Sequence, residues 1–92
     1  MNTPVKDNPA KSRFELDVDG KTVFANYRRN GATLYIPYVE APPSLRGSGA
    51  AGHLMEGVMA IARAEGLTVV PICGYAANWI HRHREHHDLL ER

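Results

Sequence analysis

Small residues gather in one segment of the chain, which runs from Leu45 to Gly52 and reads LRGSGAAG. Glycines let the backbone turn tightly and approach a ligand without obstruction from a Cβ atom. An apolar pattern with helical spacing follows at once, so the unpaired N–H groups and the positive dipole end of that helix point at the segment. With Arg46 beside it, the segment is predicted to bind an anionic group such as a phosphate.

Two common phosphate-binding motifs fit this segment poorly. The Walker pattern GxxxxGK[ST] does not occur, and no lysine lies in the turn. Gly47, Gly49 and Gly52 satisfy the dinucleotide pattern GxGxxG by spacing. However, hairpin signals precede it and no ribose-binding unit follows, which argues against a Rossmann domain. A purely structural role, in which the glycines allow close packing at a helix start, stays open.

Histidines near the end of the chain suggest a metal site at first sight. His83 and His87 have the i, i+4 spacing that places two ligands on one helix face, and His81 and His86 lie beside them. Arginines and acidic residues separate them, and no cysteine cluster accompanies them. We therefore predict no metal, because histidines at helix ends usually serve solvation or complement the helix dipole.

Length and composition indicate one small domain of ordinary polarity. The chain has 92 residues, 43% of them hydrophobic, and a formal net charge of +1, so nothing calls for a nucleic acid partner. Cys73, as the one cysteine, excludes an internal disulfide and favours a cytoplasmic location. No apolar run is long enough to span a membrane, so no membrane partner is expected. Residues 1–12 are expected to form a disordered tail before a domain at 13–92.

Three strands in antiparallel order are predicted after this tail. Alternating apolar residues around Phe14 to Val18 and Val23 to Tyr27 flank an Asp19-Gly20 turn, and Asn30-Gly31 leads into a third run that ends near Glu40. Pro37 interrupts the third run. Because proline cannot donate a ladder hydrogen bond, we expect an unpaired side, a bulge or a divergence of strands there.

The second half of the chain predicts a helix, a strand and one or two short helices. Apolar residues recur at helical spacing from Ala51 to Glu65, and Leu67 to Pro71 reads as a strand parallel to the third one. Short helices are expected at 75–83 and 85–90. The fold class is therefore α/β, or more strictly α+β: an antiparallel three-stranded meander, then a helix, a parallel strand and the short helices.

This order of elements resembles the acetyl-CoA-binding half of the GNAT acyltransferase superfamily, through the RxxGxA pattern of Arg46, Gly49 and Ala51. More narrowly, the chain is similar to the short YjdJ-type N-acetyltransferase family in its VEAPPSLRGSGAA, LTVVPIC and HRHREHHDLL segments. The similarity covers roughly 14–90. Compared with a full-length GNAT domain, the sequence is missing the usual early helices and the strands after the last long helix. The resemblance therefore implies a minimal GNAT-like fold.

The resemblance also implies a coenzyme A site. Backbone N–H groups from Gly47 to Ala51 would hold the pyrophosphate, and the pantetheine arm would lie along the third strand near Val39 to Ala41. Asn78 would hydrogen-bond the pantetheine amides. The cofactor-binding residues so implied are Val39, Glu40, Ala41, Arg46, Gly47, Ser48, Gly49, Ala50, Ala51 and Asn78.

Acetyl transfer from a thioester to an amine also needs groups that move protons. Glu40 could accept one, directly or through water, or could be a solvated charge at a strand end. Cys73 could carry the acetyl group as a nucleophile, protonate the leaving thiolate or serve packing alone. Tyr75 is a second candidate acid. The family usually continues with proline and an aromatic residue after this cysteine, and Gly74 departs from that pattern.

The sequence therefore predicts an acetyl-CoA-dependent N-acetyltransferase with an unidentified acceptor, either a small-molecule or a protein amine. The alternative is a module that binds coenzyme A or acyl-CoA and regulates without catalysis. In either case we expect a monomer or a homodimer.

Overall fold

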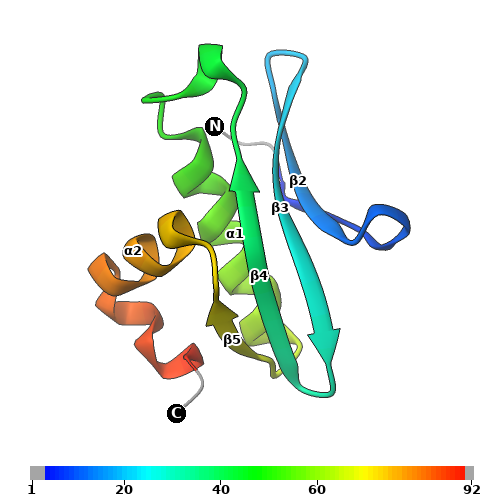
Figure 1. The fold of residues 1–92 in the computed structure, drawn as a ribbon, viewed down its shortest axis with the longest axis vertical. Coiled ribbons are helices and arrows are strands. Elements are labelled where there is room, and N and C mark those ends of the chain that lie inside the picture. Colours follow the sequence, from blue (N-terminus) through cyan, green and yellow to red (C-terminus); the bar gives the residue numbers. More distant parts are fainter. Residues whose placement is uncertain (1–3, 91–92) are drawn as a thin grey trace.

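The computed structural model describes residues 4–90 and contains one five-stranded sheet in the order β1-β2-β3-β4-β5 (Figure 1). The strands are β1 Lys6–Asn8, β2 Arg13–Val18, β3 Lys21–Asn30, β4 Thr33–Glu40 and β5 Thr68–Pro71. The helices are α1 Ala50–Ala64 and α2 Gly74–Arg82, with short 3₁₀ turns at Pro9–Lys11, Pro43–Leu45 and Arg84–Leu89. This is the α/β fold expected from the sequence.

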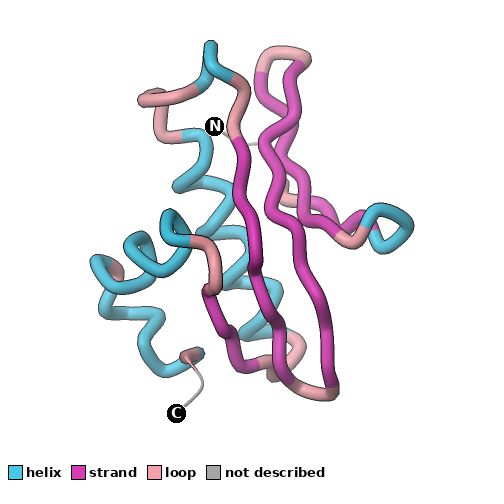
Figure 2. Tube along the Cα trace, viewed as in Figure 1, coloured by secondary structure: helices cyan, strands magenta, loops and turns pink. Residues whose placement is uncertain are grey.

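The predicted meander is formed by β2, β3 and β4, all antiparallel. The β2–β3 turn places both Asp19 and Gly20 at positive φ (52° and 76°), the backbone that a tight hairpin with right-handed twist requires. Figure 2 shows the two long strands β3 and β4 running side by side through the sheet. The hairpin predictions are confirmed.

Pro37 lies in a β-bulge, one of the three arrangements that its missing N–H predicts. Asn26 of β3 pairs with Tyr38 and Arg28 pairs with Tyr35, so that Ile36 and Pro37 together face the single residue between them. The extra residue reverses the alternation of side chains along β4. Leu34 and Ile36 are buried before the bulge, whereas Val39 and Ala41 pack on the core after it.

The parallel pairing of β4 with β5 is also confirmed, and it is short. It begins at Thr33 opposite Thr68 and ends at Ile36 opposite Pro71. The carbonyl oxygen of Ile36 accepts two hydrogen bonds, from the N–H of Ile72 at 3.0 Å and from that of Cys73 at 2.9 Å. Beyond this point β4 pairs with β3 alone.

The core lies between the sheet and α1. Leu54, Met55, Val58 and Met59 of α1 are completely buried against apolar side chains of β2 to β5. The helix α2 lies beside β5 in Figure 1 and packs on α1, where a Cβ on Gly52 would lie 3.4 Å from Nε1 of Trp79. Within residues 4–90, no helix crosses the other face of β2, β3 and β4, called here the uncovered face.

The N-terminal segment differs from the expected disordered tail over residues 4–12. Lys6–Asn8 pairs with β2 as an edge strand, and Pro9–Lys11 forms a turn capped by the Asn8 side chain. Val5 covers Gly57 of α1 so closely that a Cβ on this glycine would lie 2.2 Å from one of the valine methyl groups. Tertiary contacts thus hold residues 4–12 in a regular structure that their own composition does not predict. Residues 1–3 lie outside the described part.

Among the described residues, no helix is long and apolar enough to span a membrane.

Candidate active site

The glycine-rich segment forms a compact turn that leads from β4 into α1. Gly47 and Gly49 have φ values of +81° and +88°, which residues with a Cβ atom rarely adopt. A Cβ on either glycine would meet no atom within 4 Å, so both are required for their backbone angles and face open space. The Ser48 hydroxyl stabilises the turn, because it donates to the carbonyl of Leu45 at 2.5 Å and accepts from the N–H of Ala50 at 3.3 Å.

The first turn of α1 directs free N–H groups toward the same place. The helical ladder begins with the N–H of His53, which donates to the carbonyl of Gly49 at 3.0 Å. In the part of the chain that the structure describes, the N–H groups of Ala51 and Gly52 have no acceptor. Together with the helix dipole they favour an anion in front of this turn.

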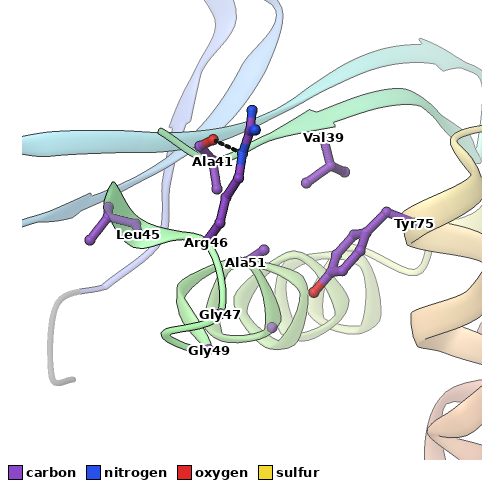
Figure 3. A pocket seen from close by; sticks show the side chains of 9 residues that line it. Val39, Ala41, Leu45, Arg46, Gly47, Gly49, Ala51 and Tyr75 are labelled. Carbon is purple, nitrogen blue, oxygen red and sulfur yellow. Dashed lines mark hydrogen bonds between the residues drawn. The ribbon is translucent and has the colours of Figure 1, made fainter. Parts of the chain in front are cut away.

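A cavity of about 430 Å³ opens between this turn and the second half of β4 (Figure 3). Val39 and Ala41 form the strand side, Gly47, Gly49 and Ala51 form the helix side, and Tyr75 of α2 reaches across from a third direction. Leu45, Arg46 and Gly52 complete the lining. Its size is within the range of small-molecule sites.

Arg46 joins the two sides of the cavity at one end. Its Nε donates to the carbonyl of Ala41 at 3.2 Å, the hydrogen bond drawn in Figure 3. Arg46 makes no ion pair with the described residues, and its guanidinium points away from Gly47 and Gly49, past Ala41 (Figure 3).

Comparison with known proteins identifies the fold that carries this cavity. The sequence model of the GCN5-related N-acetyl-transferase family matches residues 13–89, most of the chain. The chain belongs to this family. Its members transfer acetyl groups, generally from acetyl-CoA, so the protein is an N-acetyltransferase.

A solved structure supports the fold independently of the sequence match. The solution structure of a GCN5-like protein from Staphylococcus aureus matches with a TM-score of 0.70 at 18% identity, covering 99% of this chain and 90% of that one. Among curated proteins, no sequence matches significantly.

Six of the ten residues predicted to bind the cofactor line the cavity of this N-acetyltransferase: Val39, Ala41, Arg46, Gly47, Gly49 and Ala51. Ser48 shapes the turn, and Ala50 is completely buried. Asn78 lines a second cavity of about 410 Å³ along α2, with Tyr75, His81 and Arg82.

Tyr75 is the predicted catalytic residue that the structure places in the cavity. Burial raises the pKa of Tyr75, an effect that the charge of Arg82 partly opposes and that Cys73 adds to. The phenol is therefore protonated at neutral pH and can donate a proton.

Glu40 and Cys73 do not line this cavity. Glu40 accepts a hydrogen bond from the Tyr38 hydroxyl on the opposite side of β4. Cys73 is partly buried against the core at the start of α2, where its carbonyl accepts from the N–H of Ala77 at 2.9 Å. The three predicted catalytic side chains are thus divided between two faces of the sheet.

Leu45 and Gly52 line the cavity but were absent from the predicted set. Gly52 had a signal in the sequence, since it completes the GxGxxG spacing that a Rossmann fold would require. Leu45 had none, because a buried leucine before a loop is indistinguishable from ordinary packing.

The histidines join α2 and the C-terminal 3₁₀ turn to the rest of the fold. His83 Nδ1 lies 2.6 Å from the carbonyl oxygen of Trp79. The two rings are also stacked, with their centres 3.8 Å apart. His86 Nε2 lies 2.6 Å from a carboxylate oxygen of Glu56. His86 Nδ1 lies 3.5 Å from a guanidinium nitrogen of Arg63. These contacts attach His83 to α2 and His86 to α1, and the absence of a metal stays a prediction from the sequence.

Proposed function

We propose that the cavity between β4 and the first turn of α1 binds acetyl-CoA, and that the protein transfers the acetyl group to a primary amine. The observation that supports this most strongly is the convergence of the Gly47 to Gly52 backbone and the start of α1 on one side of the cavity, whose lining also includes Arg46. A pyrophosphate needs several donors and a cationic field, and all of them are available there.

The apolar side of the cavity fits the rest of the cosubstrate. Val39 and Ala41 face it from β4, whose edge is not paired with β5 beyond Ile36. An extended pantetheine arm with two amide groups can hydrogen-bond such a strand edge as a neighbouring strand would. The thioester would then lie toward the point where β4 and β5 separate.

Direct transfer of the acetyl group from the thioester to the amine is the simpler route in this geometry, compared with a route through an acetyl-cysteine. The amine nitrogen bonds to the carbonyl carbon, the carbon–sulfur bond breaks, and the leaving thiolate takes the proton of Tyr75. The proton that the amine releases goes to water, because Glu40, which the sequence predicts to accept it, lies on the opposite side of β4 from the cavity. Because Cys73 does not line the cavity, we expect Cys73→Ala to retain most of the activity, and its complete loss would favour an acetyl-cysteine intermediate instead.

Calorimetric titration with coenzyme A tests the proposed site. Gly49→Glu introduces a negative side chain at the turn and should weaken binding at least about 100-fold, which corresponds to about 2.7 kcal/mol. Gly31→Glu is the matched control, because Gly31 also has a positive φ (+61°) and open space around it but lies in the β3–β4 turn. Unchanged affinity in Gly49→Glu would refute the proposal.

Turnover separates this proposal from a non-catalytic module, since acetyl-CoA consumption with a panel of amines is expected only of an enzyme. A cytoplasmic location, a monomeric or homodimeric state and the choice between a small-molecule and a protein acceptor stay predictions from the sequence.

A further inference from the structure

Side chains that can ligate a metal ion gather where the C-terminal 3₁₀ turn packs against α1. Glu56 comes from α1, whereas Glu85 and His86 come from the turn. One donor atom of each, a carboxylate oxygen or an imidazole nitrogen, lies within 4.8 Å of the donor atoms of the other two. Because Zn²⁺ holds such ligands at about 2.0 to 2.2 Å, donors up to about 4 Å apart can share one ion. Small side-chain rotations bring these three donors into that range.

A hollow of about 190 Å³ borders this cluster and brings two more imidazoles to it. Glu56 lines the hollow together with His53 of α1 and His83, which follows α2. His83 Nδ1 lies 2.6 Å from a backbone carbonyl oxygen, which can only accept, so Nδ1 carries a proton and the lone pair of the neutral ring is on Nε2. Histidines that bind metal ions are usually held in this way. The hollow thus adds nitrogen donors and room for a water ligand.

The charges around the cluster favour a divalent cation. Glu56 and Glu85 together balance the charge of such an ion, and without a cation two carboxylates this close repel each other. Arg63 lies beside the cluster, since one of its guanidinium nitrogens is 3.5 Å from His86 Nδ1. The charge of Arg63 is largely compensated by Asp88, whose carboxylate oxygens lie 2.6 Å and 3.1 Å from the guanidinium nitrogens.

We propose that Glu56, Glu85 and His86 bind one Zn²⁺ ion, with an imidazole of the hollow or water completing the coordination shell. The imidazole nitrogen selects Zn²⁺ over Mg²⁺ and Ca²⁺, which prefer sites made of oxygen ligands alone. Because one ligand belongs to α1 and two belong to the 3₁₀ turn, the ion joins the C-terminal turn to the helix that follows the glycine-rich segment. This structural site is independent of the proposed acetyl transfer.

The spacing of residues along the chain does not indicate this site. The spacing that suggests a metal ion is that of His83 and His87, but His87 Nε2 lies 3.0 Å from the carbonyl oxygen of Ile80, away from the cluster. Glu85 is one of the acidic residues that separate the histidines and argue against a metal in the sequence. The fold instead places Glu85 among the candidate ligands, together with a glutamate from α1.

Calorimetric titration of the untagged chain with Zn²⁺ tests the proposed site. We expect one ion per chain and no comparable binding of Mg²⁺ or Ca²⁺. His86→Gln should weaken Zn²⁺ binding at least about tenfold. His81→Gln is the matched control, because His81 is exposed and lines the other cavity along α2, and it should leave the affinity unchanged. Undetectable Zn²⁺ binding by the wild type, or equal binding by His86→Gln, would overturn the proposal and leave His86 and Glu56 as an ion pair only.

A second variant keeps the test independent of whether His86→Gln folds. The Glu56 side chain is 52% exposed, so Glu56→Gln should fold and should also weaken Zn²⁺ binding at least about tenfold. Zn²⁺ should raise the melting temperature of the wild type more than that of Glu56→Gln, because an ion that binds the folded chain stabilises it. In the wild type, Zn²⁺ should shift the imidazole NMR signals of His86 and leave those of His81 in place. An equal change of melting temperature in both chains, or shifts at His81 alone, would contradict the site.

Discussion

The two halves of β4 differ in almost every respect except their pairing with β3. From Thr33 to Tyr35 the strand is paired on both edges, and the side chains of Leu34 and Ile36 are completely buried. From Tyr38 to Glu40 it is paired with β3 alone, and none of the side chains from Pro37 to Glu40 is completely buried. One additional residue in the bulge thus turns Val39 toward the cavity and Tyr38 and Glu40 toward the opposite face of the sheet.

The largest expected difference between the two halves is in stability. Leu34→Ala removes a completely buried side chain and should lower the free energy of unfolding by about 3 kcal/mol. Val39→Ala removes methyl groups at a partly exposed position and should cost only about 1 kcal/mol. Urea denaturation of both variants measures the difference.

Cosubstrate binding should show the opposite order. Val39→Ala should weaken coenzyme A several-fold in calorimetry, because Val39 lines the cavity, whereas folded Leu34→Ala should retain the affinity of the wild type. If Leu34→Ala and Val39→Ala lost equal stability and equal affinity for coenzyme A, the distinction between the two halves of β4 would be contradicted.

A smaller effect is expected in the titration of Tyr38. The hydrogen bond to Glu40 raises the pKa of Tyr38 above its ordinary value of 10.0, because it favours the protonated phenol. The interaction is therefore present below pH 10 and is lost as the pH rises through the higher pKa of the folded protein. We expect Glu40→Gln to return the titration of Tyr38, followed by ¹³C NMR of the tyrosine rings, toward 10.0, and Glu15→Gln to leave it unchanged.

Local chemistry made much of this fold predictable. Asp19-Gly20 specifies a tight turn through its positive φ angles, and Pro37 specifies an irregularity because it has no N–H. The glycine-rich segment before α1 likewise predicts an open turn at a helix start, and Gly47 and Gly49 have the expected backbone angles.

The positions that the sequence did not predict depend on tertiary structure. The pattern around Pro37 indicates an irregularity but not its size, so it could not show that Glu40 faces away from the cavity. Lys6–Asn8 is too polar and short to indicate a strand, and it forms one because β2 offers a free edge and Val5 packs on Gly57.

The most direct test of the central claim is an amide NMR titration with coenzyme A, performed on the wild type and on a chain without Pro37. The claim is that the bulge brings one face of the second half of β4 to the cosubstrate. In the wild type we expect shifts at Val39, Ala41 and the turn from Gly47 to Ala51, with little change at Leu34 and Ile36. Without Pro37, the protein should still give the spectrum of a folded sheet but lose these shifts. The same shifts in both chains, or wild-type shifts confined to other parts of the molecule, would contradict the account.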